Sequence, residues 1–159
     1  MAEVLAELAA SPARRYFGVG TMFGLGLLVL YLALSQSFDA FYWQLALIGL
    51  GGAALYAAMR MLQATALRLE LRDDGLFDSE GHLLAAFDDI VTVERGMLAM
   101  KPSNGFMIVT RTRQPRRWRP GLYWVMGKRI GVGGVTAAAD AKYMADLMNM
   151  QLVERRGGL

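Results

Sequence analysis

YFGVGTMFGLGLLVLYLALSQSF (residues 16–38) and AFYWQLALIGLGGAALYAAM (residues 40–59) contain no charged residue and are separated only by Asp39. A bilayer core of about 30 Å needs roughly 20 apolar residues in a helix, so each stretch is long enough to span a membrane. Only a few residues around Asp39 remain for the turn, and the two helices must therefore be antiparallel neighbours. The sequence predicts a two-helix membrane hairpin over residues 13–65.

The charges that flank the hairpin predict its orientation. Arg14 and Arg15 precede the first span and Arg60 follows the second, whereas the turn has no lysine or arginine. Because positive charge resists translocation, both ends of the hairpin are expected in the cytoplasm. A cleaved signal peptide with a site in ALS (residues 33–35) is the alternative. That reading requires an unusually long apolar region and a leader that contains acids.

Small residues in both spans predict close helix packing. Gly20 and Gly24 form a GxxxG in the first span, and Gly49 and Gly52 lie in the second. Small side chains let helix backbones approach where no hydrophobic force drives association. We expect these glycines at a helix–helix contact. Packing within the hairpin is favoured, and a helix of another membrane protein is the alternative.

The rest of the chain predicts one small β-rich domain. Residues 2–10 show a short helical pattern, and residues 1–12 are expected to be an N-terminal cytoplasmic segment. In residues 66–159, alternating apolar and polar residues and repeated Gly and Asp turns predict short antiparallel strands. Thr136 is expected to cap an amphipathic helix over residues 137–153. The predicted fold class is a membrane α-hairpin followed by an α+β domain, an antiparallel barrel or sandwich capped by the helix.

The composition leaves little room for catalytic chemistry. The chain has no cysteine, which excludes disulfides, thiolate metal sites and cysteine nucleophiles. His82 is the only histidine, so a histidine-based metal site or triad lacks partners. Asp88 and Asp89 are adjacent and would point to opposite faces of a strand. Residues 121–129 have neither the spacing nor the Ser or Thr of a phosphate-binding loop. We expect no enzymatic activity, no metal and no cofactor.

Charge is strongly separated along the predicted domain. Residues 70–94 contain eight acids and one base, whereas residues 111–129 contain seven bases and no acid. A domain tethered to the membrane lies close to an anionic leaflet, where each base contributes about 1 kcal/mol and an indole favours the headgroup layer. Charge alone also fits nucleic acid, but the tether favours lipid or an acidic protein. The candidate binding residues are Arg111, Arg113, Arg116, Arg117, Trp118, Arg119, Lys128 and Arg129.

One stretch resembles a known family. Residues 67–95 read LRLELRDDGLFDSEGHLLAAFDDIVTVER. A strand, a tight acidic turn ending in glycine, a second strand and an aromatic-x-Asp-Ile step occur here, with DG at residues 74–75 and FDDI at residues 87–90. This order resembles the bacterial pleckstrin-homology-like family, whose members often follow one or two membrane spans. The resemblance implies a PH-like domain with a C-terminal capping helix at the bacterial inner membrane. The flanking arginines predict that both termini are cytoplasmic.

Two functions fit these observations. The first is a non-enzymatic accessory, assembly or scaffold protein whose domain contacts proteins and the membrane surface within a larger membrane complex. The second is a membrane-tethered sensor that binds anionic lipid headgroups or another anionic ligand. The predicted partners are therefore the anionic lipids of the inner leaflet and another membrane protein, and not nucleic acid.

Overall fold

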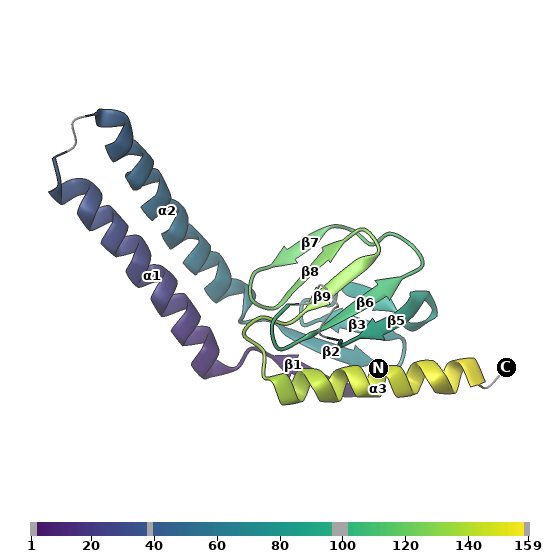
Figure 1. Ribbon diagram of the computed structural model, residues 1–159. Coiled ribbons are helices and arrows are strands. Elements are labelled where there is room, and N and C mark those ends of the chain that lie inside the picture. The colour runs from purple at the N-terminus through teal and green to yellow at the C-terminus, as the bar shows by residue number, and fades with distance from the viewer. Residues whose placement is uncertain (1–2, 38–39, 97–101, 158–159) are drawn as a thin grey trace.

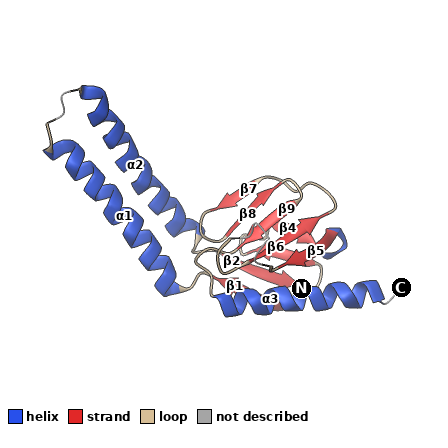
Figure 2. Cartoon of the chain, in the orientation of Figure 1, coloured by secondary structure: helices blue, strands red, loops and turns tan. Residues whose placement is uncertain are grey.

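The computed structural model describes residues 3–37, 40–96 and 102–157. It consists of a β domain, a long helical hairpin that projects from it, and a third helix along one side of the domain (Figure 1, Figure 2). The elements are β1 (Val4–Ala9), α1 (Pro12–Ser35), α2 (Phe41–Ala64), β2 (Arg68–Arg72), β3 (Gly75–Asp78), β4 (Leu83–Ala86), the 3-10 turn η1 (Phe87–Asp89), β5 (Ile90–Glu94), β6 (Phe106–Thr110), β7 (Arg117–Arg119), β8 (Tyr123–Met126), β9 (Arg129–Val132) and α3 (Ala138–Gly157).

The two predicted apolar helices are confirmed. α1 and α2 have 24 residues each, which corresponds to about 36 Å of helix and is long enough to cross a bilayer core. Most of their surface is exposed. The exposed large apolar side chains include Phe17, Phe23, Leu25, Leu28, Tyr31, Leu34, Phe41, Tyr42, Trp43, Leu45, Leu50 and Tyr56.

The two helices touch each other through a pair of glycines. A Cβ atom at Gly26 would lie 2.9 Å from Cδ2 of Leu55, and one at Gly51 would lie 2.6 Å from Cγ of Leu30. Both glycines are buried, so the backbones approach closely at this point. Small residues therefore do mediate the contact within the hairpin, and these residues are Gly26 and Gly51.

The four glycines selected from the sequence lie elsewhere on the helices. A Cβ atom at Gly20, Gly24, Gly49 or Gly52 would meet no atom within 4 Å. Two residues correspond to about 200° of rotation in an α-helix, so Gly24 and Gly49 face away from the contact that Gly26 and Gly51 make. Contrary to expectation, these four glycines do not pack the hairpin. Contact with another membrane protein remains a prediction for them.

The N-terminal segment departs most from the predicted organisation. Instead of a helix, Val4–Ala9 form strand β1, which pairs antiparallel with β2 and places Ala9 opposite Arg68. Ala6 and Leu8 are buried and Glu7 between them is exposed, which is the period of a strand. The domain therefore includes β1, and the hairpin is inserted between the first two strands. The expected boundary that left residues 1–12 outside the domain is wrong.

The strands form two open antiparallel sheets and not a closed barrel. The sheet orders are β1-β2-β3-β4 and β5-β6-β9-β8-β7. Side chains from both sheets and from α3 share one core, which includes Leu8, Leu69, Leu71, Leu76, Phe106, Ile108, Ile130, Met144 and Met148. The predicted antiparallel strands followed by a C-terminal helix are confirmed. α3 starts one residue later than expected, and the hydroxyl of Thr136, the expected cap, donates to the carbonyl of Asn104 at 3.1 Å.

Candidate functional site

The β7–β8 hairpin lies beside the end of α2 where the chain enters the domain, while α3 runs along the opposite side (Figure 1). The turn between the two strands packs against α2 through Gly121, which has a φ of +81°. A Cβ atom at Gly121 would lie 3.0 Å from Cγ2 of Thr65 and 3.3 Å from Cε of Met61. The turn end of the β7–β8 hairpin is therefore held at the base of the helical hairpin.

Two tryptophans share one face of this β-hairpin. Trp118 and Trp124 are register partners on β7 and β8, so both side chains project to the same side of the sheet. Trp124 in turn lies opposite Gly131 of β9, where a Cβ atom would come within 2.3 Å of Cε2 of the indole. The absence of a side chain at Gly131 lets the Trp124 ring lie across the strand. Trp118 is on the edge strand and is 67% exposed.

A groove of about 300 Å³ runs along this face. It is lined by Arg116, Arg117, Trp118, Trp124, Val125 and Met126. The lining thus combines two arginines with indole and thioether-bearing side chains, and it includes no acid. Arg129 is the register partner of Met126, which puts another base on the same face. We call this set of residues the Trp–Arg groove.

The structure separates the predicted bases into groups. Arg117 and Arg119 both alternate with Trp118 along β7. Arg119 points toward the other sheet and pairs with the carboxylate of Glu80 at 2.5 Å, whereas Arg117, at the start of the strand, lines the groove. Arg111 lies near the end of α3, where it lines a pocket with Arg155 and Arg156. Within the described part of the chain, no ion pair to an acid involves Arg111, Arg113, Arg116, Arg117, Lys128 or Arg129.

The loop that carries the bases is held by one acid from the neighbouring turn. Asp89 accepts hydrogen bonds from the backbone N–H of Thr112 at 3.0 Å, from its hydroxyl at 2.7 Å and from the amide of Gln114 at 2.6 Å. The backbone N–H of Gln114 also donates to the carbonyl of Gly127 at 2.9 Å. Asp89 thus orders the loop instead of neutralising its arginines.

A polar network that the sequence analysis missed joins the two sheets. Buried Asp78 accepts hydrogen bonds from the backbone N–H groups of Glu80 and His82, at 3.1 and 2.9 Å, and from the hydroxyl of Tyr123 at 2.9 Å. His82 Nδ1 lies 3.1 Å from Asp78 Oδ2. The Asp-to-His spacing of four residues across a Ser-Glu-Gly turn is the only sequence signal for this arrangement.

Three side chains at the β3–β4 turn bring atoms of metal-binding type close together. One ligand atom each from Asp78, Glu80 and His82 lies within 4.8 Å of the others, so the expectation that His82 lacks such neighbours is wrong. Both oxygens of Asp78 already accept hydrogen bonds from the protein, however, and Glu80 is paired with Arg119. These bonds favour a role in closing the β3–β4 turn over metal binding.

The pKa values of Asp78 and Tyr123 favour the hydrogen bond between them at neutral pH. Burial alone would raise the pKa of Asp78, but hydrogen bonds from the His82 N–H and the Tyr123 hydroxyl outweigh it and hold this pKa below its usual value. Burial, with the hydrogen bond to Asp78, raises the pKa of Tyr123 to about 12. A carboxylate thus accepts from a neutral phenol, and this bond connects the β3–β4 turn to β8.

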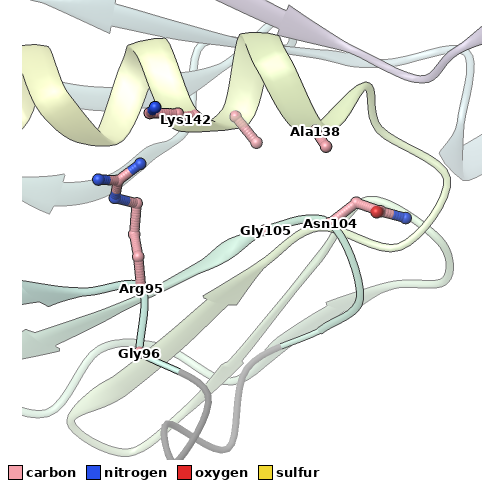
Figure 3. A pocket seen from close by; sticks show the side chains of 7 residues that line it. Arg95, Gly96, Asn104, Gly105, Ala138 and Lys142 are labelled. Atoms are coloured by element: carbon pink, nitrogen blue, oxygen red, sulfur yellow. The ribbon is translucent and has the colours of Figure 1, made fainter.

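A second cavity, of about 550 Å³, lies between α3 and the ends of β5 and β6 (Figure 3). Arg95 and Lys142 both extend along its rim, and Ala138 and Asn104 lie at the other end. Arg95 is paired with Asp146 at 2.9 Å. The cavity borders Gly96, after which residues 97–101 lie outside the described chain.

No protein-family model, curated protein or solved structure matches this chain. The resemblance of residues 67–95 to the PH-like family therefore remains a prediction that rests on short motifs and element order.

Proposed function

We propose that this chain is a non-enzymatic integral protein of the bacterial inner membrane that serves as an accessory, assembly or scaffold subunit of a larger membrane complex. In this proposal the β domain is a PH-like module that contacts the inner leaflet and a protein partner. The observation that carries the proposal is the insertion of the α1–α2 hairpin between β1 and β2. A hairpin anchored through two strands holds the domain at a fixed place on the membrane.

The exposed apolar surface of the hairpin supports a membrane location. Monomeric soluble proteins rarely expose contiguous apolar patches larger than a few hundred Å². Here large apolar side chains are exposed along both helices, whereas the β domain buries its own core. A bilayer covers such a surface without cost, because α1 and α2 satisfy their backbone hydrogen bonds internally.

The charges at the base of the hairpin support the orientation. Pairing of β1 with β2 requires both ends of the hairpin to lie on one side of the bilayer. At that end Arg14 donates to the carbonyl of Thr136 at 3.1 Å, and Arg15 donates to the carbonyl of Leu62 at 3.0 Å. Arginines in the flanks favour the cytoplasmic side.

Two further surfaces are suited to protein partners. Gly20 and Gly24 form an exposed GxxxG on the side of α1 that faces away from Gly26, where another transmembrane helix would pack closely. On the domain, α3 exposes Tyr143, Met150 and Val153 at helical spacing. Both surfaces fit a subunit that joins membrane and cytoplasmic parts of an assembly.

The arrangement of the domain is compatible with the PH-like assignment. Its two antiparallel sheets and C-terminal helix follow the order that the resemblance implies. The 3-10 turn at Phe87–Asp89, between β4 and β5, coincides with the aromatic-x-Asp-Ile step of the family.

The experiment that tests the assembly role is native size determination after mild detergent extraction. A large co-purifying complex is expected for the full chain, and the double change Gly20→Leu and Gly24→Leu should reduce it. Gly49→Leu with Gly52→Leu tests the second helix in the same way. Extraction of the full chain as a free monomer at native expression levels would contradict the role in a complex.

A second function, a membrane-tethered sensor of anionic lipid headgroups or another anion, is favoured by one specific observation. The Trp–Arg groove joins bases that form no ion pair within the described chain to exposed indole surface. Such a lining fits an anionic, partly apolar ligand better than a purely solvated face.

A further inference from the structure

We infer that the Trp–Arg groove binds the headgroup of a single anionic glycerophospholipid. The phosphate lies at Arg116 and Arg117, and the glycerol and first acyl carbons lie on Trp118, Trp124 and Met126. This inference deepens the proposed function, because it rests on the domain being held at the membrane. It adds a discrete, saturable site to what would otherwise be a diffuse attraction between a basic surface and an anionic leaflet.

The arginines of the groove favour an oxyanion such as phosphate. A planar guanidinium presents paired N–H donors that match a phosphate better than the single ammonium of lysine does. Arg116 is exposed and Arg117 is partly exposed, and neither forms an ion pair with a described acid. The nearest acid-bound arginine on the strand is Arg119, whose guanidinium is directed to Glu80. The two groove arginines thus keep their donors for a ligand.

The apolar walls select a lipid over a free phosphate. Trp118 is 67% exposed and Met126 is 59% exposed, although both are large and apolar. A hydrated inorganic anion would gain nothing from this surface, whereas a phospholipid brings apolar carbon directly below its phosphate. Indole rings are also favoured at the level of lipid headgroups. The combination of two indoles, a thioether and two guanidinium groups matches the boundary between headgroup and acyl chain.

The position of the groove fits a ligand that is itself in the membrane. β7 lies against the end of α2, and the turn at Gly121 touches Thr65 and Met61 there (Figure 1). A membrane-spanning α2 leaves the hydrocarbon near this end, since Arg60 is its first charged residue. The turn end of the β7–β8 hairpin is therefore held beside the headgroup layer, and the groove extends from there along the same two strands. α3 lies on the other side of the domain (Figure 1).

The shape of the groove is set by contacts within the domain itself. Gly131 leaves space for the Trp124 ring, and the register between β7 and β8 fixes Trp118 beside it. Tyr123, next to Trp124 on β8, is tied to Asp78 of the other sheet. A preformed site binds more tightly because less conformational entropy is lost on binding.

The test uses the full chain in a neutral detergent, with Trp43→Phe so that the two remaining tryptophans both line the groove. A water-soluble short-chain phosphatidylglycerol is titrated and tryptophan fluorescence is recorded. We expect a saturable change, and at least a roughly tenfold weaker affinity after Arg116→Gln with Arg117→Gln. The matched control is Arg113→Gln with Lys128→Gln, which removes the same charge outside the groove lining and should change the affinity less than threefold.

Two further titrations distinguish the ligand classes. Short-chain phosphatidylcholine should bind much more weakly, and glycerol 3-phosphate, which has no acyl chain, should not saturate at the same concentrations. Equal loss in the two double variants would overturn the inference in favour of diffuse attraction. Equally tight binding of glycerol 3-phosphate would overturn the lipid assignment, and the absence of any saturable change would overturn the site. Trp118→Ala, with unchanged circular dichroism, should also weaken binding of the short-chain lipid, monitored through Trp124.

The outcome is separable from that of the proposed function. Binding in detergent micelles does not depend on which way the domain faces a bilayer or on a protein partner. A saturable site in micelles combined with a domain turned away from the bilayer would contradict the membrane orientation and leave the groove site standing. A domain that faces the bilayer but shows no saturable binding in micelles would contradict only the groove site.

Discussion

Ala9 and Arg68 are register partners across β1 and β2, although both membrane-length helices lie between them in the chain. The β domain therefore starts before the hairpin and resumes after it. Two connections from one folded domain restrict its rotation about the membrane normal more than a single tether would. This relationship underlies the fixed placement of the Trp–Arg groove beside α2.

The first prediction concerns the contribution of β1 to stability. Leu8 is fully buried in the shared core, whereas Val4 on the same strand is 43% exposed. Leu8→Ala should lower the free energy of unfolding by about 2–5 kcal/mol, and Val4→Ala by less than about 1 kcal/mol. Chemical denaturation of the full chain in detergent measures both. Equal, small effects would show that β1 is not part of the domain core.

The second prediction concerns fragments of the domain. A fragment that begins at Leu67 lacks β1 and exposes the edge of β2, so it should aggregate or remain partly unfolded. A fragment in which residues 3–10 are joined by a short flexible linker to residues 67–157 restores the pair and should fold. Dispersion of amide signals in a nuclear magnetic resonance spectrum compares the two. A well-dispersed spectrum of the shorter fragment would contradict the role of β1.

The third prediction concerns the hydrogen bond between Tyr123 and Asp78. Tyr123→Phe should lower the free energy of unfolding by about 1–3 kcal/mol at neutral pH, because Asp78 loses a buried donor. Tyr143→Phe, at an exposed position on α3, is the control and should be neutral.

The pH dependence of this effect has a defined sign. The pKa of Asp78 is lowered by folding, so its stabilising contribution is present above its ordinary pKa and is lost as the pH falls through the lowered value. The pKa of Tyr123 is raised to about 12, so its contribution is present at neutral pH and is lost as the pH rises from 10.0 toward 12. The deficit of Tyr123→Phe should therefore shrink in acid below about pH 4 and again at strongly alkaline pH. A constant deficit at every pH would exclude the ionised carboxylate as its cause.

The fourth prediction concerns the contact between the two helices. Gly51→Leu places side-chain atoms where Leu30 and the carbonyl of Gly26 already lie, so the hairpin should loosen and thermal stability in detergent should fall. Gly20→Leu adds the same atoms on an open face and should leave the stability of the isolated chain unchanged. Two introduced cysteines, one on α1 and one on α2, report the separation of the helices by cross-linking, because the native chain has no cysteine. Identical behaviour of the two variants would contradict the observed contact face.

The elements that the sequence predicts well are those with a strong local signal. Two uncharged runs identify α1 and α2, and alternating residues with Gly and Asp turns identify β2 to β6. The local sequence of β1 predicts a helix because Leu5 and Leu8 have helical spacing, whereas its strand partner β2 lies beyond the hairpin. Such pairing over a long sequence separation overrides local preference.

The candidate site was predicted in composition but not in arrangement. The basic run and Trp118 identify the surface, whereas the ion pair with Glu80, visible only once the two sheets are placed, directs Arg119 away from it. The contact glycines were misassigned because GxxxG marks two small residues on one helix face without showing which face meets α2. The network at Asp78 depends on Tyr123, far away in the sequence, and so has no local signal beyond the turn itself.

The most direct measurement of the central proposal is the depth of the β7–β8 face relative to the bilayer. Met126 in the Trp–Arg groove and Tyr143 on α3 are each 59% exposed, and the absence of native cysteine allows a single spin label at either position. In nanodiscs that contain anionic lipid, the label at Met126→Cys should be accessible to oxygen and shielded from a water-soluble nickel complex. The label at Tyr143→Cys should show the reverse. Equal exposure of both labels to the nickel complex would contradict a domain held with this face against the membrane.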